Sequence, residues 1–457
     1  FEALIQIQSR PPDKQLPQVA EAMKARIDAA RQERKRALDD VGRLFPRYKD
    51  LIDPRSPGIA ETRAVLAPDE ALVAILSGTR RTYVWVLRRD REPVLHVADL
   101  PAARLTSLVS TLRQGVDLST APDLDHLPKF DLAAARELYD ALLGPVEAAW
   151  GDARTLLVVA DGALTRLPLS LLVSGPAKDL ASAPWLARRV GIATLPSVNA
   201  LITLRQLPAA AANRLPFVGF GDPAFGISAA PATPTTRGGK RLLTLHVRNA
   251  PTRAWESMLS ERGESLISGG PGNGGHLPPL PDTRDEILAM AAALGADPRR
   301  DVYLGAAANR SNLVQARPEA RRVVAFATHG LVAGDLPGLN QPALALAPSA
   351  DGKDNGLLLL EDVLRLKLDA DWVVLSACNT AAGESASEGL SGLGRGFFYA
   401  GARSLLLTHW SVESESAAKL VSGLFRHYAR KPAQGRAEAL RQSMRALMDG
   451  PQKAYVH

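Results

Sequence analysis

Two residues whose types suit nucleophilic chemistry each follow a short apolar run. Cys378 is the only cysteine and comes after Trp-Val-Val-Leu at 372–375. His329 comes earlier in the chain, after Val-Val-Ala-Phe-Ala at 323–327. A thiolate is a good nucleophile, and a nearby imidazole can favour the thiolate and later protonate a leaving amine. The two residue types together predict a Cys378–His329 dyad.

Each of these residues alone has a more common explanation. A single cysteine is usually a small buried hydrophobe, and a single histidine usually lies at the surface or is satisfied in the core. The two residues together favour a catalytic role over a structural one, because both follow strand-like runs and precede small or polar residues. Of the eight histidines, only His329 is followed by glycine. We expect the backbone N–H groups of Gly330 and Cys378 to form an oxyanion hole.

The runs that precede the two residues are typical of buried strands. They are short and rich in valine, as strands are when helices cover both faces of a sheet. Functional side chains in open α/β sheets gather at the carboxyl ends of the strands. We therefore expect His329 and Cys378 to face each other across one cleft, at the carboxyl end of a mostly parallel sheet.

Other segments alternate between strand and helix patterns, which predicts an α/β fold. Apolar and β-branched runs predict strands at 71–76, 82–87, 94–97, 155–160 and 404–408. Apolar spacings of three and four predict helices at 17–44, 133–150, 389–399, 417–429 and 436–447. Thr283 and Glu286 fit a capping box at the start of a further helix, and Gly401 fits the end of the helix at 389–399.

Three stretches in combination resemble the CHAT family of caspase-like peptidases. They are Phe-Ala-Thr-His-Gly at 326–330, Leu-Leu-Leu-Leu-Glu-Asp-Val at 357–363 and Val-Leu-Ser-Ala-Cys-Asn-Thr-Ala at 374–381, with supporting motifs at 159–168, 219–225, 280–287 and 388–410. The resemblance runs from about residue 60 to the end. It implies a caspase-like fold with a Cys–His dyad, as in caspases, separases and gingipains. The caspase motif Gln-Ala-Cys-x-Gly is absent, so cleavage after aspartate is not implied.

The resemblance also implies a domain organisation. Residues 1–59 would be a helical segment that ends a larger upstream region with tetratricopeptide-like repeats. Residues 60–225 would be a degenerate caspase-like half, with Asp161 and Gly162 after a buried strand but no dyad. The Gly and Pro content of residues 226–281 predicts a mobile connector; the alternative is an insertion with local structure, since 242–247 fits a strand. Residues 282–457 would be the catalytic half.

The strand after the catalytic cysteine pairs with an extended substrate in this clan, which implies residues 404–411 here. Ser411 would then contact the substrate. Trp410 either walls the first pocket or belongs to the core, and His409 is either a second polar group in the cleft or a capping residue. Acidic residues that would favour a basic substrate side chain are Glu384, Glu388, Glu413 and Glu415. The sequence shows no third member of the dyad; the candidate carboxylates to orient His329 are Asp335, also a candidate substrate contact, and Asp362.

Composition and net charge exclude several other classes of protein. The apolar share of 46% and charged share of 23% are ordinary for a globular protein. The net charge of +7 comes from arginines scattered among acidic residues, so direct nucleic-acid binding is not expected. We find no membrane-length apolar run, zinc spacing or Walker loop, and we expect neither metal nor cofactor. A single cysteine fits a reducing, cytoplasmic compartment.

Two function classes remain. The first is a cysteine endopeptidase that cleaves a specific protein target and is restrained until an upstream region or a partner protein activates it. The second is a catalytically silent interaction module on a caspase-like fold. The intact His329–Cys378 pair favours the endopeptidase. Other cysteine chemistry fits less well, because a phosphatase needs Cys-x5-Arg and position 384 is Glu.

Overall fold

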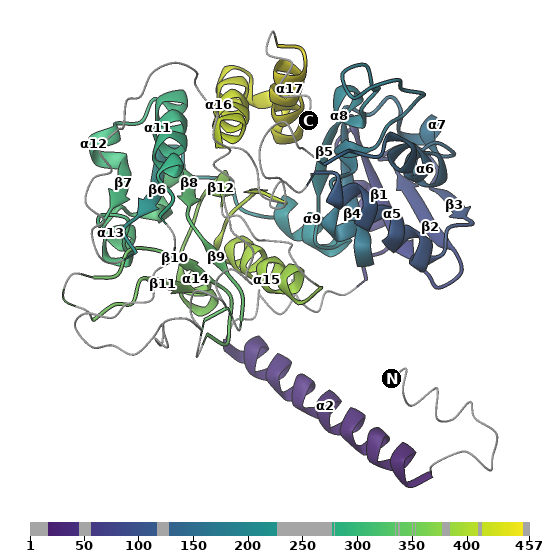
Figure 1. Ribbon diagram of the computed structural model, residues 1–457, viewed down its shortest axis with the longest axis horizontal. Coiled ribbons are helices and arrows are strands. Elements are labelled where there is room, and N and C mark those ends of the chain that lie inside the picture. Colours follow the sequence, from purple (N-terminus) through teal and green to yellow (C-terminus); the bar gives the residue numbers. More distant parts are fainter. Residues whose placement is uncertain are drawn as a thin grey trace. The chain divides into compact units, whose positions relative to one another are not determined.

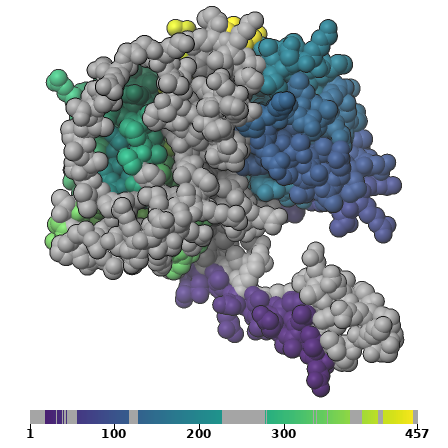
Figure 2. All heavy atoms as spheres, in the orientation of Figure 1, coloured from purple at the N-terminus to yellow at the C-terminus, as the bar shows by residue number. Residues whose placement is uncertain are grey.

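The computed structural model describes residues 17–44, 56–116, 128–225, 277, 279–333, 335–336, 339–349, 351, 353–376, 384–409 and 414–450. The chain divides into two compact units, Phe1–Arg55 and Ser56–His457. The described part of the first unit is one helix of 28 residues, α2 (Pro17–Leu44), with the predicted bounds. Most of its described side chains are exposed. Figure 2 draws the atoms of this helix in purple.

The second unit begins with a five-stranded mixed sheet, called sheet I here (Figure 1). Its order is β3-β2-β1-β4-β5, in which β1, β2 and β3 are antiparallel and β1, β4 and β5 are parallel. The strands are β1 (Glu70–Ser77), β2 (Thr82–Leu87), β3 (Val94–Ala98), β4 (Thr155–Ala160) and β5 (Gly191–Thr194). The positions of β1, β2, β3 and β4 confirm the predicted strands, whereas β5 was not predicted.

Helices cover both faces of sheet I. Leu108 of α5 (Ala102–Gln114) and Leu138 of α6 (Leu132–Leu142) share a buried cluster with Val73 of β1. On the other face, Leu201 of α9 (Val198–Arg205) packs with Leu72. The remaining helices are α4 (Ile59–Ala64), α7 (Glu147–Trp150) and α8 (Leu186–Arg189). The predicted helix at 133–150 is in fact α6 and α7, separated by a segment that contains Pro145, a residue that interrupts helices.

A second five-stranded sheet, sheet II, is parallel throughout and has the order β13-β12-β8-β6-β7. Its strands are β6 (Leu215–Pro223), β7 (Val302–Gly305), β8 (Arg321–Ala327), β12 (Trp372–Leu375) and β13 (Leu405–Leu407). On one face α11 (Asp282–Leu294) and α16 (Ser414–Arg430) pack with Ala325 and Val374. On the other face α13 (Arg310–Gln315), α14 (Leu360–Arg365) and α15 (Glu384–Ala400) pack with Val324. This mostly parallel sheet between helices confirms the predicted fold class and is consistent with a caspase-like α/β fold.

The membership of β6 corrects the predicted boundary between the two halves. Residues 215–223 lie within the predicted first half at 60–225, yet β6 pairs with β7 and β8 inside sheet II. The predicted connector at 226–281 lies almost wholly outside the described residues. The boundary between the sheets therefore falls before Leu215, because strand pairing and not composition decides which segment belongs to a sheet.

The last described helix, α17 (Arg436–Met448), packs against both sheets. Ala439 lies in the core beneath sheet II, while the start of the helix lies against β5. A Cβ added to Gly191 would be 2.8 Å from the Ala437 carbonyl carbon. Arg441 Nη1 also donates to the Arg188 carbonyl at 2.8 Å. The sheet I half and the sheet II half are therefore joined by packing and by hydrogen bonds.

Two helix ends test the sequence patterns directly. Helix α15 stops at Gly401, whose φ of +113° favours glycine, as predicted. The predicted capping box of Thr283 and Glu286 is wrong. The N-cap of α11 is Pro281, with no side-chain cap, because both predicted cap residues are buried and bond to other segments.

Candidate functional site

His329 lies where β8 leaves sheet II. Its backbone carbonyl accepts the Ala345 N–H at 2.9 Å, and the neighbouring Thr328 hydroxyl donates to the Ala345 carbonyl. The chain then continues as β9 (Gly330–Leu331) in a small antiparallel sheet with β10 (Ala343–Ala345) and β11 (Leu357–Leu359). His329 is 6% exposed. Strand pairing on both sides therefore fixes the backbone that carries this imidazole.

The Gly330 N–H points away from β10. Gly330 pairs with Leu344, and the Ala345-to-His329 bond lies one residue outside that pair. The pair is consequently of the non-hydrogen-bonded type, in which both residues direct N–H and C=O away from the partner strand. This orientation is what a backbone donor for an oxyanion requires.

The register of β8 and β12 relates His329 to Cys378. Phe326 pairs with Leu375 in parallel strands, and the Ser376 N–H donates to the Phe326 carbonyl at 2.9 Å. His329 and Cys378 each follow a member of this pair at the same sequence offset. Adjacent strands are about 4.8 Å apart. Cys378 itself lies outside the described residues, so the dyad stays a prediction that this register supports.

The predicted carboxylate partners of His329 have other bonds. Asp335 Oδ2 accepts the Val332 N–H at 2.7 Å. Burial raises the pKa of Asp335, and this bond opposes the rise. Asp362 accepts the Leu359 N–H at 3.0 Å and pairs with Arg310 at 2.8 Å. These bonds shape the turn after β9 and the start of α14.

The described ring against His329 is Phe225, which sequence reasoning did not single out. Their ring centroids are 5.3 Å apart, with an interplanar angle of 45°. Phe225 follows β6 and packs, with Leu277, against the apolar cluster of Leu331, Leu336, Leu339, Ala343 and Ala345. The motif at 219–225 was the available signal, because it ends in this aromatic residue after a buried strand.

The glycines of β6 allow α11 to lie directly on that strand. A Cβ at Gly219 or Gly221 would be 2.7 Å from side-chain carbons of Ile287. Asp222 follows with φ of +46° at a bulge, an uncommon conformation for a residue other than glycine. Its carboxylate pairs with Arg284 of α11 at 2.8 Å. The carboxyl end of β6 is thus fixed to the first turn of α11.

Glu286 of α11 contacts the other flanking strand. Its Oε2 accepts the Ser376 hydroxyl at 3.0 Å, and both residues are buried. Sequence reasoning missed this pair because Glu286 also fits a local capping pattern. The partner is distant in the sequence, and nothing local indicated it.

His409 follows β13, the strand at one edge of sheet II. Burial, and to a smaller extent the charge of Arg113, lower its pKa to about 4, although part of the residue remains exposed. Arg113 of α5 donates to the His409 carbonyl at 3.4 Å and to the Arg166 carbonyl at 2.7 Å. The sheet I half therefore contacts the end of β13.

The side chains of three further predicted site residues are not described. Trp410 and Ser411 lie outside the described residues. Glu384 is the first residue of α15, and its side chain is not described. The predicted substrate contacts therefore stay predictions; His409 and Asp335 are the two whose surroundings are described above.

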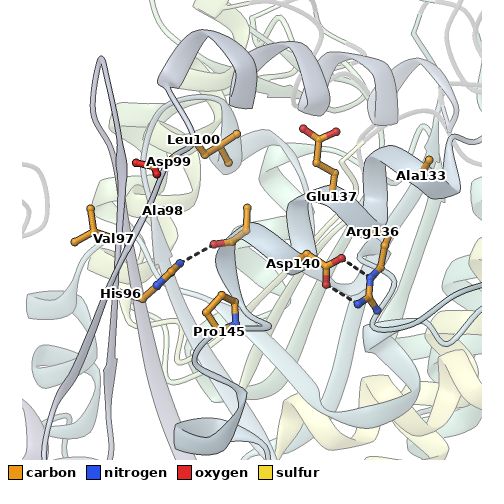
Figure 3. Close-up of a pocket in the computed structure, with 11 residues that line it drawn as sticks. His96, Val97, Ala98, Asp99, Leu100, Ala133, Arg136, Glu137, Asp140 and Pro145 are labelled. Atoms are coloured by element: carbon orange, nitrogen blue, oxygen red, sulfur yellow. Dashed lines mark hydrogen bonds and ion pairs between the residues drawn. The ribbon is translucent and has the colours of Figure 1, made fainter.

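A pocket of about 770 Å³ lies between β3 and α6 (Figure 3). His96 Nε2 is 3.1 Å from the Ala141 carbonyl oxygen, and Arg136 pairs with Asp140 at 2.6 Å. Glu137 pairs with Arg104 at 2.7 Å. The charged groups of this pocket already have protein partners, and the pocket belongs to the half without His329.

The sheet, the strand-end histidine and the motifs define a caspase-like α/β protein. The CHAT domain family matches residues 132–456, which is most of the chain. The chain belongs to this family, which is associated with caspase-like peptidases. A search of curated proteins finds no match.

Two further kinds of feature, membrane spans and metal sites, concern the described residues as a whole. None of the helices there combines the length and the apolar character needed to cross a membrane. No cluster of three or more His, Cys, Asp or Glu side chains suited to a metal ion occurs in the same part of the chain.

Proposed function

We propose that the chain is a cysteine endopeptidase that uses a Cys378–His329 dyad. The observation that carries the proposal is the register of β8 and β12, since Phe326 pairs with Leu375 and the two functional residues follow at equal offsets. Parallel strands bring such residues to the same edge of a sheet. Membership in the CHAT family supports the same chemistry.

The mechanism uses each residue in one step. The Cys378 thiolate attacks the scissile carbonyl carbon, and the oxyanion accepts hydrogen bonds from the N–H groups of Gly330 and Cys378. Imidazolium of His329 then donates its proton to the leaving amine as the C–N bond breaks. Water, activated by the neutral imidazole, hydrolyses the thioester and restores the thiol. The orientation of Gly330 away from β10 supports its role in this scheme.

Substrate recognition is assigned to β13. It is an edge strand of sheet II among the described strands, and Leu407 is 37% exposed. An extended peptide can add to such an edge through main-chain hydrogen bonds. The end of this edge is held by Arg113 of the first half. We further propose that an upstream region or a partner protein restrains the enzyme, with α2 as part of the attachment.

The test is a cleavage screen with the full chain. A mixture of cellular proteins is incubated with the wild type, and new N-termini are identified by labelling and mass spectrometry. Cys378→Ala and His329→Ala should each lower cleavage by about 10² or more, while His427→Ala, a histidine on α16, should not. Cleavage that persists in both dyad variants would contradict the proposal.

The single cysteine supplies an independent measurement. Iodoacetamide reacts much faster with a thiolate than with other side chains, and Cys378 is the one cysteine of this sequence, so the fast alkylation rate reports its thiolate. His329→Ala should shift the pH dependence of alkylation toward that of a free thiol. An unchanged profile, together with no cleavage by the wild type, would favour the catalytically silent interaction module instead.

A further inference from the structure

Helix α11 contacts the carboxyl ends of the two strands that flank β8. At the end of β6, the Asp222 N–H donates to Thr283 Oγ1 at 2.7 Å, and Arg284 pairs with the Asp222 carboxylate. At the end of β12, the Ser376 hydroxyl donates to Glu286 Oε2 at 3.0 Å. One short stretch of helix thus holds the strands on both sides of the one that leads to His329.

Glu286 differs from the other residues of this stretch because it is an ionisable residue with an exposure of 0%. A buried carboxyl group is costly to desolvate, and an apolar residue of similar size often stabilises a core equally well. The carboxylate makes a directed bond to the Ser376 hydroxyl. Ser376 is held a second time through its N–H, which donates to the Phe326 carbonyl. Its position is therefore fixed from the helix and from β8.

We propose that Glu286 is a positioning residue for the nucleophile. By holding Ser376, it sets the point at which the chain leaves β12, and Cys378 follows two residues later in the sequence. Ile287 packs directly on Gly219 and Gly221 of β6, and this contact fixes the distance between α11 and sheet II. This inference deepens the proposed dyad and rests on it.

The experiment measures the alkylation rate of Cys378 by iodoacetamide against pH, in the full chain, together with kcat and KM for a cleaved peptide from the screen. Ser376→Ala and Glu286→Leu remove the hydroxyl–carboxylate bond. Glu286→Gln keeps an oxygen acceptor and serves as the conservative variant. Asp285→Asn changes an exposed residue of the same helix and is the matched control. Thermal unfolding of each variant confirms that it is folded.

Ser376→Ala and Glu286→Leu should lower kcat about 10-fold to 100-fold, since misplacement by about 1 Å can cost 10². KM should stay within about twofold, and the alkylation profile should move toward that of a free thiol. Glu286→Gln should retain most of the activity, and Asp285→Asn all of it. Ser376→Ala keeps the test decisive if Glu286→Leu fails to fold.

Two results would overturn the inference. The His329→Ala variant distinguishes failure of the positioning role from failure of the dyad itself. If Ser376→Ala keeps the wild-type kcat and alkylation profile while His329→Ala changes both, the dyad stands and Glu286 has no positioning role. If His329→Ala leaves the alkylation profile unchanged, the dyad itself is wrong, and the inference fails with it.

Discussion

Acidification should destabilise the fold through His409, at the end of the proposed substrate strand. Its surroundings lower its pKa from the ordinary value of 6.5 to about 4. The folded state therefore binds fewer protons than the unfolded state between these values, so the free energy of unfolding falls as the pH falls through this window. Above the unfolded pKa the contribution of His409 is fully present.

The size of this contribution follows from the shift. Each pKa unit is worth about 1.4 kcal/mol, so a shift of this size corresponds to at most about 3 kcal/mol. Part of the residue remains exposed, and solvent screening reduces the effect. We therefore expect about 1–2 kcal/mol to be lost when the pH falls from neutral to about 4. Carboxyl groups also titrate in this range, so the effect must be isolated by comparison.

The assay is urea unfolding, followed by tryptophan fluorescence, at closely spaced pH values. His409→Gln removes the titrating ring and should flatten the pH dependence by the expected 1–2 kcal/mol relative to wild type. Arg113→Gln removes the smaller, electrostatic cause of the shift, so the folded-state pKa of His409 should rise; the loss of stability should then be smaller and complete at a higher pH. Equal pH dependence in wild type and His409→Gln would refute the reasoning, because it would mean that the ring titrates alike in both states.

Two further predictions concern stability. Gly401→Ala should cost more than about 2 kcal/mol in urea unfolding, because φ is +113° and the new Cβ would be 1.9 Å from the Leu368 carbonyl oxygen; Gly392→Ala, in open space within α15, should instead stabilise by up to about 1 kcal/mol. Asp301→Ala should cost about 3–5 kcal/mol, because it leaves buried Arg321 without its ion-pair partner at 2.5 Å. A loss under about 1 kcal/mol for either Gly401→Ala or Asp301→Ala would contradict the packing described.

Sequence patterns predicted the regular elements well, because their signals are local. The strand at 155–160 and the helix at 17–44 have the predicted bounds. The antiparallel sheet of β9, β10 and β11 was not predicted as a sheet, since its strands have two or three residues. Such strands are too short to show a period. Their pairing is nonetheless what directs the Gly330 N–H away from β10.

The sequence predicted which residues would do the chemistry of the candidate site. It did not predict which residues pack against them or hold them in place. His329 and Cys378 could be found because strand-end position and residue chemistry are both visible in the sequence. Glu286 was interpreted as a cap because Thr-x-x-Glu is a local pattern, whereas its partner Ser376 is distant in the chain. Phe225 gave no periodic signal. Supports of this kind depend on tertiary contacts, which a local pattern does not encode.

The course of β6 explains why the two ends of the segment at 226–276 meet the same site. The first strand of sheet II in the sequence is β6, which starts at Leu215 and pairs with β8. Strands β7 and β8 follow later in the chain. Phe225 follows β6 and lies against His329, and α11 begins a few residues after Leu277 and contacts both β6 and Ser376. Residues on both sides of this segment are therefore fixed to the strands around His329. Fixed contacts at both ends, rather than continuity of sequence, are therefore what assemble the site from residues before and after this segment.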